Sequence, residues 1–323
     1  MTSFTVVVTD HDFESLDIEE ALLGDVATIC DLSESSESEF GAALAEADGV
    51  LNLRRNLNSE RIADMQGCRI IARYGIGVDN IDADAAAEQG IYVTNVPNYC
   101  DEEVSDHAMA LLLAIARGVM AYDKSVAEGE WDRDVATPLH RLSTQTAGIV
   151  GFGAIGRALG RRLDALGFTV LASDPFLSEE DVSDEPASLV SFETVLAESD
   201  YVSIHSPLTE DTRGMFDADA FKAMKDDAAL INVARGPIVN EGALLDALED
   251  GSIGAAGLDV SDSEPPAVDS PLRDHPDIVT TPHVAWYSEE ANDQRRYEAA
   301  QCVSAVLADE TPNNVIVGPD DAA

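Results

Sequence analysis

The chain has 323 residues, enough for about two domains with sizeable cores, and 45% of them are hydrophobic. Acidic residues outnumber basic ones by 62 to 19, and the formal net charge is −43. Such a charge excludes nucleic acid and anionic membranes as expected partners. The recurring Val, Ile and Leu runs argue against a disordered acidic protein, and the sparse Cys and His residues predict no metal site.

The acidic residues are spread along the whole chain, and only three residues are lysines. We expect the acidic residues to form a solvated shell suited to multimolar salt, where a Debye length of about 3 Å or less screens their mutual repulsion. The chain starts without a basic signal-peptide region, and its longest apolar segment, residues 108–116, is too short to cross a bilayer. These features predict a salt-adapted cytoplasmic protein.

Strands alternate with helices in the first part of the chain, which predicts a parallel sheet. We expect strands at residues 4–8, 27–29, 49–53 and 69–73, and helices at 16–23, 40–47 and 59–65. The polar, acidic residues 33–39 are expected to form a surface loop before the second of these helices.

A turn-rich connector at residues 95–99 leads into a broad apolar pattern that predicts one long helix over residues 101–120. Residues 121–145 are expected to be irregular. Later strands are expected at residues 146–150, 168–172, 201–205, 229–233, 254–258 and 278–280. A helix over residues 288–307 is expected to return to the first domain, before a polar tail.

A glycine-rich turn, with Gly151, Gly153 and Gly156, follows the strand at residues 146–150, and Asp174 ends the next strand. The first glycine permits a tight turn into a helix, the second lets a pyrophosphate approach the backbone, and the third allows close helix packing. The start of the helix offers N–H groups to phosphates, and the carboxylate can accept hydrogen bonds from an adenine-ribose diol. This order of features predicts a dinucleotide-binding domain.

Four later motifs complete a recognisable pattern: Asn-Val-Ala-Arg-Gly-Pro at 232–237, Gly-Leu-Asp-Val at 257–260, Glu-Pro-Pro at 264–266 and Thr-Pro-His at 281–283. With residues 74–82, 95–107 and 205–209, they resemble the D-isomer-specific 2-hydroxyacid dehydrogenases over nearly the whole chain. Residues 282–289 look most like the subgroup related to C-terminal-binding proteins.

The resemblance implies an α/β fold of two Rossmann-like, doubly wound parallel-sheet domains. An NAD-binding domain, residues 101–288, would be inserted into a discontinuous, flavodoxin-like substrate domain, residues 1–100 and 289–323. The active site would lie in the cleft between them.

Three side chains suit the transfer of hydride from a secondary alcohol to nicotinamide. His283 can take or return the hydroxyl proton, and Glu264 can orient and stabilise its protonated ring. Arg235 follows a buried strand, and its planar fork can hold a carboxylate and polarise the reacting oxygen. Alone, Glu264 would more often be a solvated loop carboxylate and Arg235 a surface ion pair; the resemblance favours the catalytic roles.

The resemblance also implies that the backbone N–H groups of Ile76 and Gly77 hold the substrate carboxylate, and that Arg73 and Trp286 face the substrate. Structural roles, as an ion pair and a packed interdomain aromatic, stay open for these two side chains. The implied cofactor-binding residues beyond the three glycines and Asp174 are Ala154, Ile155, His205, Val233, Ala234 and Asp259, the last accepting a hydrogen bond from the carboxamide.

Asp174 is followed by Pro175 and Phe176, with no Arg or Lys to meet a 2′-phosphate, so NAD is expected rather than NADP. The function expected first is an NAD-dependent D-2-hydroxyacid dehydrogenase that interconverts a D-2-hydroxy acid and a 2-keto acid. An NAD(H)-sensing interaction module of the corepressor type and a short phosphoglycerate dehydrogenase remain alternatives, the latter using Arg54 or Arg55 for a distal anion. A formate dehydrogenase is disfavoured because that branch has Gln where Glu264 stands. A homodimer through residues 101–145 is expected from the family.

Overall fold

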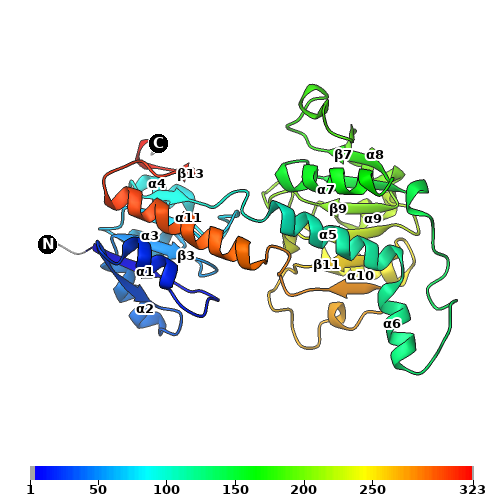
Figure 1. The fold of residues 1–323 in the computed structure, drawn as a ribbon, viewed down its shortest axis with the longest axis horizontal. Coiled ribbons are helices and arrows are strands. Elements are labelled where there is room, and N and C mark those ends of the chain that lie inside the picture. Colours follow the sequence, from blue (N-terminus) through cyan, green and yellow to red (C-terminus); the bar gives the residue numbers. More distant parts are fainter. Residues whose placement is uncertain (1–3, 322–323) are drawn as a thin grey trace. The chain divides into compact units, whose positions relative to one another are not determined.

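The computed structural model describes residues 4–321 and divides the chain into two compact units. Unit 1 comprises Met1–Cys100 and Ser288–Ala323, and unit 2 comprises Asp101–Tyr287. The chain passes from one unit to the other after residue 100 and after residue 287, at or next to the domain bounds expected from the sequence. Each unit has its own sheet and its own hydrophobic core (Figure 1).

Unit 1 is built on a six-stranded sheet in the order β13-β5-β4-β3-β1-β2, parallel except for β13. Its strands are β1 (Phe4–Val8), β2 (Ala27–Asp31), β3 (Gly49–Asn52), β4 (Ile70–Arg73), β5 (Tyr92–Thr94) and β13 (Val315–Val317). Its helices are α1 (Asp17–Leu23), α2 (Glu37–Ala45), α3 (Ser59–Ala63), α4 (Ala83–Glu88) and α11 (Glu289–Leu307). Helix α11, from the end of the chain, packs on α1, β3 and β4 and so joins the two segments of the unit.

Unit 2 holds a seven-stranded parallel sheet in the order β12-β11-β10-β9-β6-β7-β8. The strands are β6 (Thr146–Val150), β7 (Thr169–Ser173), β8 (Ser188–Leu189), β9 (Tyr201–Ile204), β10 (Ala229–Asn232), β11 (Ala255–Leu258) and β12 (Ile278–Thr280). Helices α5 (Asp101–Ala116) and α7 (Ala154–Ala165) pack together, as do α8 (Phe192–Glu198), α9 (Ala218–Ala223) and α10 (Glu241–Glu249). The predicted pair of Rossmann-like parallel-sheet domains is confirmed.

Three predicted boundaries were wrong. The helix expected over residues 101–120 ends at Ala116, because Gly118 has φ +59°, and a second helix, α6 (Val119–Ala127), starts at an angle of 61° to it. Consequently, part of the segment expected to be irregular is helical. Helix α2 starts at Glu37, inside the expected loop, because Ser36 and Glu39 form a capping box. The expected polar tail contains β13, which pairs with β5.

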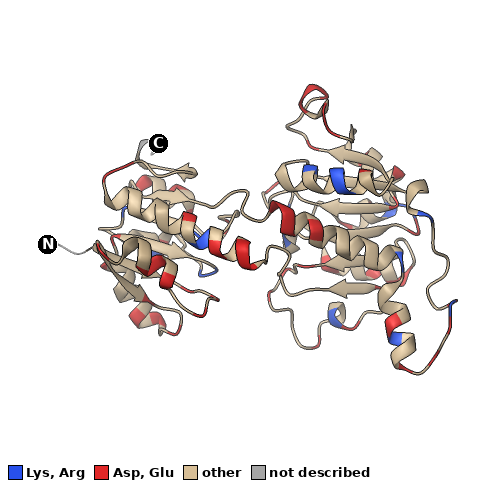
Figure 2. Ribbon diagram, in the orientation of Figure 1, with Lys and Arg blue, Asp and Glu red and all other residues tan. Residues whose placement is uncertain are grey.

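Asp and Glu residues line helices and loops of both units, whereas the strands are mostly uncharged (Figure 2). Among the described residues, no single helix is long and apolar enough to cross a membrane, and only the bent pair α5–α6 passes that test by length and composition. Residues 4–321 contain no group of three or more His, Cys, Asp or Glu side chains that could hold a metal ion.

Candidate active site

The predicted cofactor residues lie where five parallel strands of unit 2 end. Gly151 follows β6 with φ +88°, and a Cβ there would come within 2.6 Å of the backbone nitrogen of Ser206. Gly153 precedes α7 and has no atom within 4 Å of the position of a Cβ. The first position requires glycine for the fold, whereas the second leaves open the space that a pyrophosphate needs at the start of a helix.

Gly156 lies in the first turn of α7, where a Cβ would come within 2.4 Å of the carbonyl oxygen of Gly151. Its predicted role in close packing therefore has a direct geometric reason. Ala154 and Ile155 begin the same helix. No side chain caps this helix, so the N–H groups of its first turn point out of its N-terminal end and can donate to a ligand. These features fit the phosphates of a dinucleotide.

Asp174 follows β7 and is fixed against the glycine turn. Its carboxylate accepts hydrogen bonds from the backbone N–H groups of Phe152 at 2.9 Å and Phe176 at 3.0 Å. The remaining acceptor positions of the two oxygens suit the hydroxyl groups of a ribose. The residues of this chain therefore fit a dinucleotide without a 2′-phosphate.

His205, at the end of β9, donates to or accepts from the Ser203 hydroxyl through Nε2, at 2.9 Å. Burial lowers the pKa of His205 to about 4, so its ring is uncharged near neutral pH. Val233 and Ala234 follow β10, where the buried Asn232 side chain fixes their loop by accepting from Ala234 N and donating to Arg235 O. Asn232 was not predicted as a site residue.

His283 and Glu264 meet directly, with His283 Nδ1 at 2.5 Å from Glu264 Oε2. Burial would raise the pKa of Glu264, but the hydrogen bond and charge of His283, the Ser261 N–H group and the charge of Arg235 hold it below its usual value. Since Nδ1 contacts the carboxylate, Nε2 is the ring nitrogen available to a substrate. Arg235, Glu264 and His283 are thus brought together at one edge of the unit 2 sheet.

The loop that carries His283 is strained and is held by Asp259. His283 has φ +54°, which is uncommon for a residue with a side chain. The Asp259 carboxylate accepts from Thr281 Oγ1 at 2.6 Å and from the N–H groups of Val284 and Ala285 at 2.9 Å. Its predicted contact with a carboxamide stays a prediction; the structure adds a role in shaping the histidine loop.

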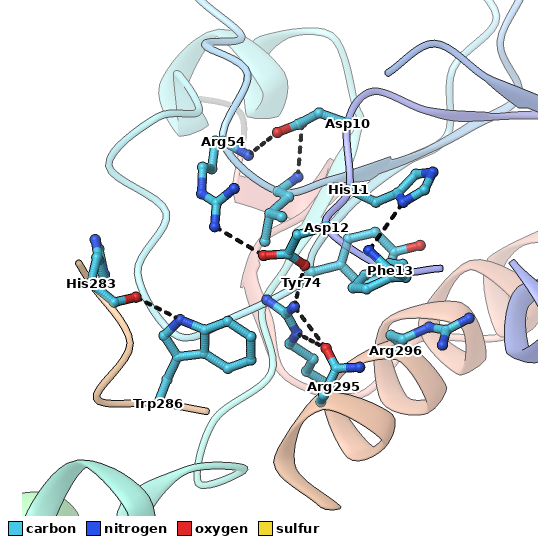
Figure 3. Close-up of polar contacts among 12 residues, drawn as sticks. Asp10, His11, Asp12, Phe13, Arg54, Tyr74, His283, Trp286, Arg295 and Arg296 are labelled. Atoms are coloured by element: carbon cyan, nitrogen blue, oxygen red, sulfur yellow. Dashed lines mark hydrogen bonds and ion pairs between the residues drawn. The ribbon is translucent and has the colours of Figure 1, made fainter. Parts of the chain in front are cut away.

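The remaining predicted residues divide between the two units. Trp286 donates its indole N–H to His283 O at 2.9 Å, so its ring is positioned by the same loop (Figure 3). In unit 1, Arg73 ends β4, and its guanidinium lies over Gly75, where a Cβ would meet Arg73 Nη1. Asn95 Nδ2 donates to Ile76 O at 2.7 Å and so holds the loop that presents Ile76 and Gly77.

Comparisons with known proteins identify the chain. Residues 109–285 match the model of the NAD binding domain of D-isomer specific 2-hydroxyacid dehydrogenases. A D-3-phosphoglycerate dehydrogenase of Archaeoglobus fulgidus is 41% identical over 75% of this chain and 46% of its own length. The glycerate dehydrogenase of Methylorubrum extorquens is 38% identical over 80% of this chain and 82% of its own length.

The chain spans about half the length of the curated phosphoglycerate dehydrogenases that it matches. Among solved structures, D-lactate dehydrogenase from Aquifex aeolicus, complexed with NAD and lactic acid, has a TM-score of 0.88 and 27% identity, covering 98% of this chain and 99% of its own. The predicted family and its NAD-binding domain are confirmed: the chain belongs to the D-isomer-specific 2-hydroxyacid dehydrogenases.

Proposed function

We propose that this protein is an NAD-dependent dehydrogenase that interconverts a D-2-hydroxy acid and a 2-keto acid. The observation that carries the proposal is the contact between His283 and Glu264, with the charge of Arg235 acting on the same carboxylate. When bound, NAD accepts or supplies the hydride. All other chemistry that the reaction needs is proton transfer and charge stabilisation, which these three side chains can perform.

In the direction of reduction, His283 Nε2 gives a proton to the carbonyl oxygen, and the Glu264 carboxylate stabilises the ring while it is protonated. Arg235 binds the substrate carboxylate and polarises the carbonyl group. We assign the N–H groups of Ile76 and Gly77 to the same carboxylate, and Arg73 and Trp286 to the rest of the substrate. Because the indole N–H of Trp286 is already bonded to His283 O, its ring face would contact the substrate.

Absorbance at the NADH band, followed with purified protein and a panel of 2-keto acids in multimolar KCl, tests this proposal. We expect at least one keto acid to be reduced to the corresponding D-2-hydroxy acid, and we expect His283→Ala to lose this activity. If no keto acid in the panel is reduced, the dehydrogenase function is refuted and the NAD(H)-sensing module is favoured. The support for that module is the segment around Trp286, which resembles the corepressor subgroup.

The preference for NAD over NADP is proposed from Asp174, whose carboxylate would repel a 2′-phosphate. Replacing Asp174 with Ala and Pro175 with Arg should shift the ratio of kcat/KM values towards NADPH. An unchanged ratio would contradict the assignment of Asp174.

A short phosphoglycerate dehydrogenase is the second candidate. The identity to D-3-phosphoglycerate dehydrogenases and the mostly exposed guanidinium of Arg54 favour it. Comparing 3-phosphohydroxypyruvate with hydroxypyruvate separates the two candidates, since only a phosphate-selecting site would prefer the former strongly.

We also propose a homodimer formed through α6 and the segment after it. Val119, Met120 and Val126 are exposed on α6, and Trp131 is 92% exposed just beyond it. A cavity of about 740 Å³ lies beside α6, at the start of β9, β10 and β11. Light scattering should give the mass of a dimer, and Trp131→Ser should weaken it; a monomeric wild-type protein would contradict the proposal. The cytoplasmic location stays a prediction.

A further inference from the structure

The carboxyl edge of the unit 1 sheet carries a carboxylate between two arginines. Asp12, in the loop after β1, accepts from Arg54 Nη2 at 2.9 Å and from Arg295 Nη2 at 2.6 Å (Figure 3). The Arg295 side chain is 2% exposed, that of Asp12 30% and that of Arg54 63%. Ligands of open α/β sheets bind at this edge, and the loop from Arg73 to Gly77 leaves β4 at the same edge.

Arg295 is fixed by more than its ion pair. Its Nε and Nη2 donate to Asn292 Oδ1 at 3.1 and 2.8 Å, and its guanidinium lies 5.1 Å from the centre of the Phe13 ring. Arg295 therefore presents a buried positive charge that cannot turn away from this edge. Burial raises the pKa of the Tyr99 hydroxyl, and the charges of both Arg295 and Arg73 oppose that rise, so both cations act on the same side chain.

Arg54 is fixed through its backbone. The Asp10 carboxylate accepts from three consecutive N–H groups, those of Leu53, Arg54 and Arg55, at 3.3, 2.8 and 3.2 Å. Asp10 is thus used to shape the loop after β3, and Asp12 is the carboxylate that meets the Arg54 side chain. Arg54 is therefore held by its backbone, and Arg295 by Asn292 and Phe13, in addition to their ion pairs with Asp12.

We propose that Asp12 determines substrate specificity by pairing with both Arg54 and Arg295, which cancels part of their positive charge and places a carboxylate between them, so that the enzyme favours 2-keto acids whose tail carries no negative charge. The inference rests on the proposed dehydrogenase function. Without Asp12, two guanidinium groups at this edge would attract a distal carboxylate or phosphate. With it, a partly exposed carboxylate repels such a tail.

The test compares two substrates of similar length, 2-oxoglutarate with a charged tail and 2-oxohexanoate with an uncharged one. In Asp12→Asn, the ratio of kcat/KM for 2-oxoglutarate to that for 2-oxohexanoate should rise about tenfold, the effect of one close charge at an effective dielectric between those of protein and water. Glu185→Gln is the matched control, since Glu185 also bridges two arginines, Arg157 and Arg161, in unit 2. Its ratio should equal that of the wild type.

A structural defect would lower kcat/KM for both substrates alike and leave their ratio unchanged. An unchanged ratio in Asp12→Asn would therefore overturn the proposal. A wild-type preference for 2-oxoglutarate, the substrate with the charged tail, would overturn it as well. Arg54→Gln provides a second test if Asp12→Asn fails to fold. It should lower the ratio, because Asp12 then opposes Arg295 alone, and an unchanged or higher ratio would contradict the proposal. A wild-type protein that reduces neither substrate nor any other keto acid instead refutes the dehydrogenase function itself.

Discussion

The contact between His283 and Glu264 makes a prediction about pH. The pKa of Glu264 lies below its usual value of 4.5, so its carboxylate is charged through the neutral range and stabilises a protonated imidazole. In Glu264→Gln this support is absent, so the rate of keto-acid reduction should begin to fall at a lower pH than in the wild type. Oxidation, which needs the unprotonated ring, should extend to lower pH.

The pH profiles of kcat/KM in both directions measure this shift. Glu241→Gln is a suitable control, because Glu241 accepts from Asp262 N in the neighbouring loop and the variant keeps an acceptor. Identical profiles in wild type and Glu264→Gln would show that the carboxylate does not act on His283.

Two glycines of the turn after β6 should respond in opposite ways to a methyl group. Gly153→Ala meets no atom within 4 Å and should fold like the wild type, but the methyl group would occupy the space expected for a pyrophosphate. We expect NADH affinity to fall by about tenfold or more, which is about 1.4 kcal/mol. Gly151→Ala, with φ +88° and a backbone contact at 2.6 Å, should lose stability by more than about 1 kcal/mol.

Fluorescence titration with NADH and chemical denaturation separate these effects. Wild-type affinity in Gly153→Ala would place the pyrophosphate elsewhere.

Among the elements, α11 depends on a buried ion pair. Arg296 Nη2 donates to Glu19 Oε2 at 2.7 Å, and Glu19, on α1, is fully buried and also accepts from the Tyr74 hydroxyl. Arg296→Met would leave the Glu19 charge without this partner, at a cost of about 3–5 kcal/mol in the free energy of unfolding.

Arg69→Met is the control, because Arg69 pairs with the exposed Asp309 and such pairs contribute about 0–1 kcal/mol. Urea denaturation measures both variants. Equal stability of the two would mean that the α1–α11 contact does not need the ion pair.

The strands and the cofactor turn could be predicted from the sequence because they are local signals. A buried parallel strand reads as an apolar run, and the glycines and Asp174 stand at fixed distances from two such runs. The break at Gly118 was also local, but the apolar pattern continued across it, so one helix was expected where there are two. Strand β13 escaped prediction because its partner, β5, lies over 200 residues earlier in the chain.

The same reasoning applies to the site. The meeting of His283, Glu264 and Arg235 was expected from the motifs that resemble the family, whereas their catalytic roles stay proposals. Asp12 and Arg295 are 283 positions apart, and neither stands in a motif, so only the packing of α11 beside the start of the chain brings them together. The role of Asp259 in shaping the histidine loop likewise depends on side-chain contacts that no spacing indicates.

At the scale of the whole molecule, the charge balance predicts that salt stabilises the fold. The 62 acidic residues exceed the 19 Lys and Arg residues, and many of those cations are already paired with carboxylates. Most acidic side chains therefore repel one another across the surface, and folding brings them closer together. Raising the KCl concentration from about 0.1 M to about 1 M shortens the Debye length from about 10 Å to about 3 Å and weakens this repulsion.

Thermal unfolding followed by circular dichroism should show a Tm that rises with KCl concentration, most steeply below about 1 M, where the Debye length changes most. Sucrose is the control, because it stabilises folded proteins by exclusion from their surface without screening charge. If screening is the cause, KCl should raise the Tm far more than an osmotically matched amount of sucrose. A Tm that falls on addition of KCl would show that the ion pairs, rather than the excess of acidic residues, dominate the electrostatics of the fold.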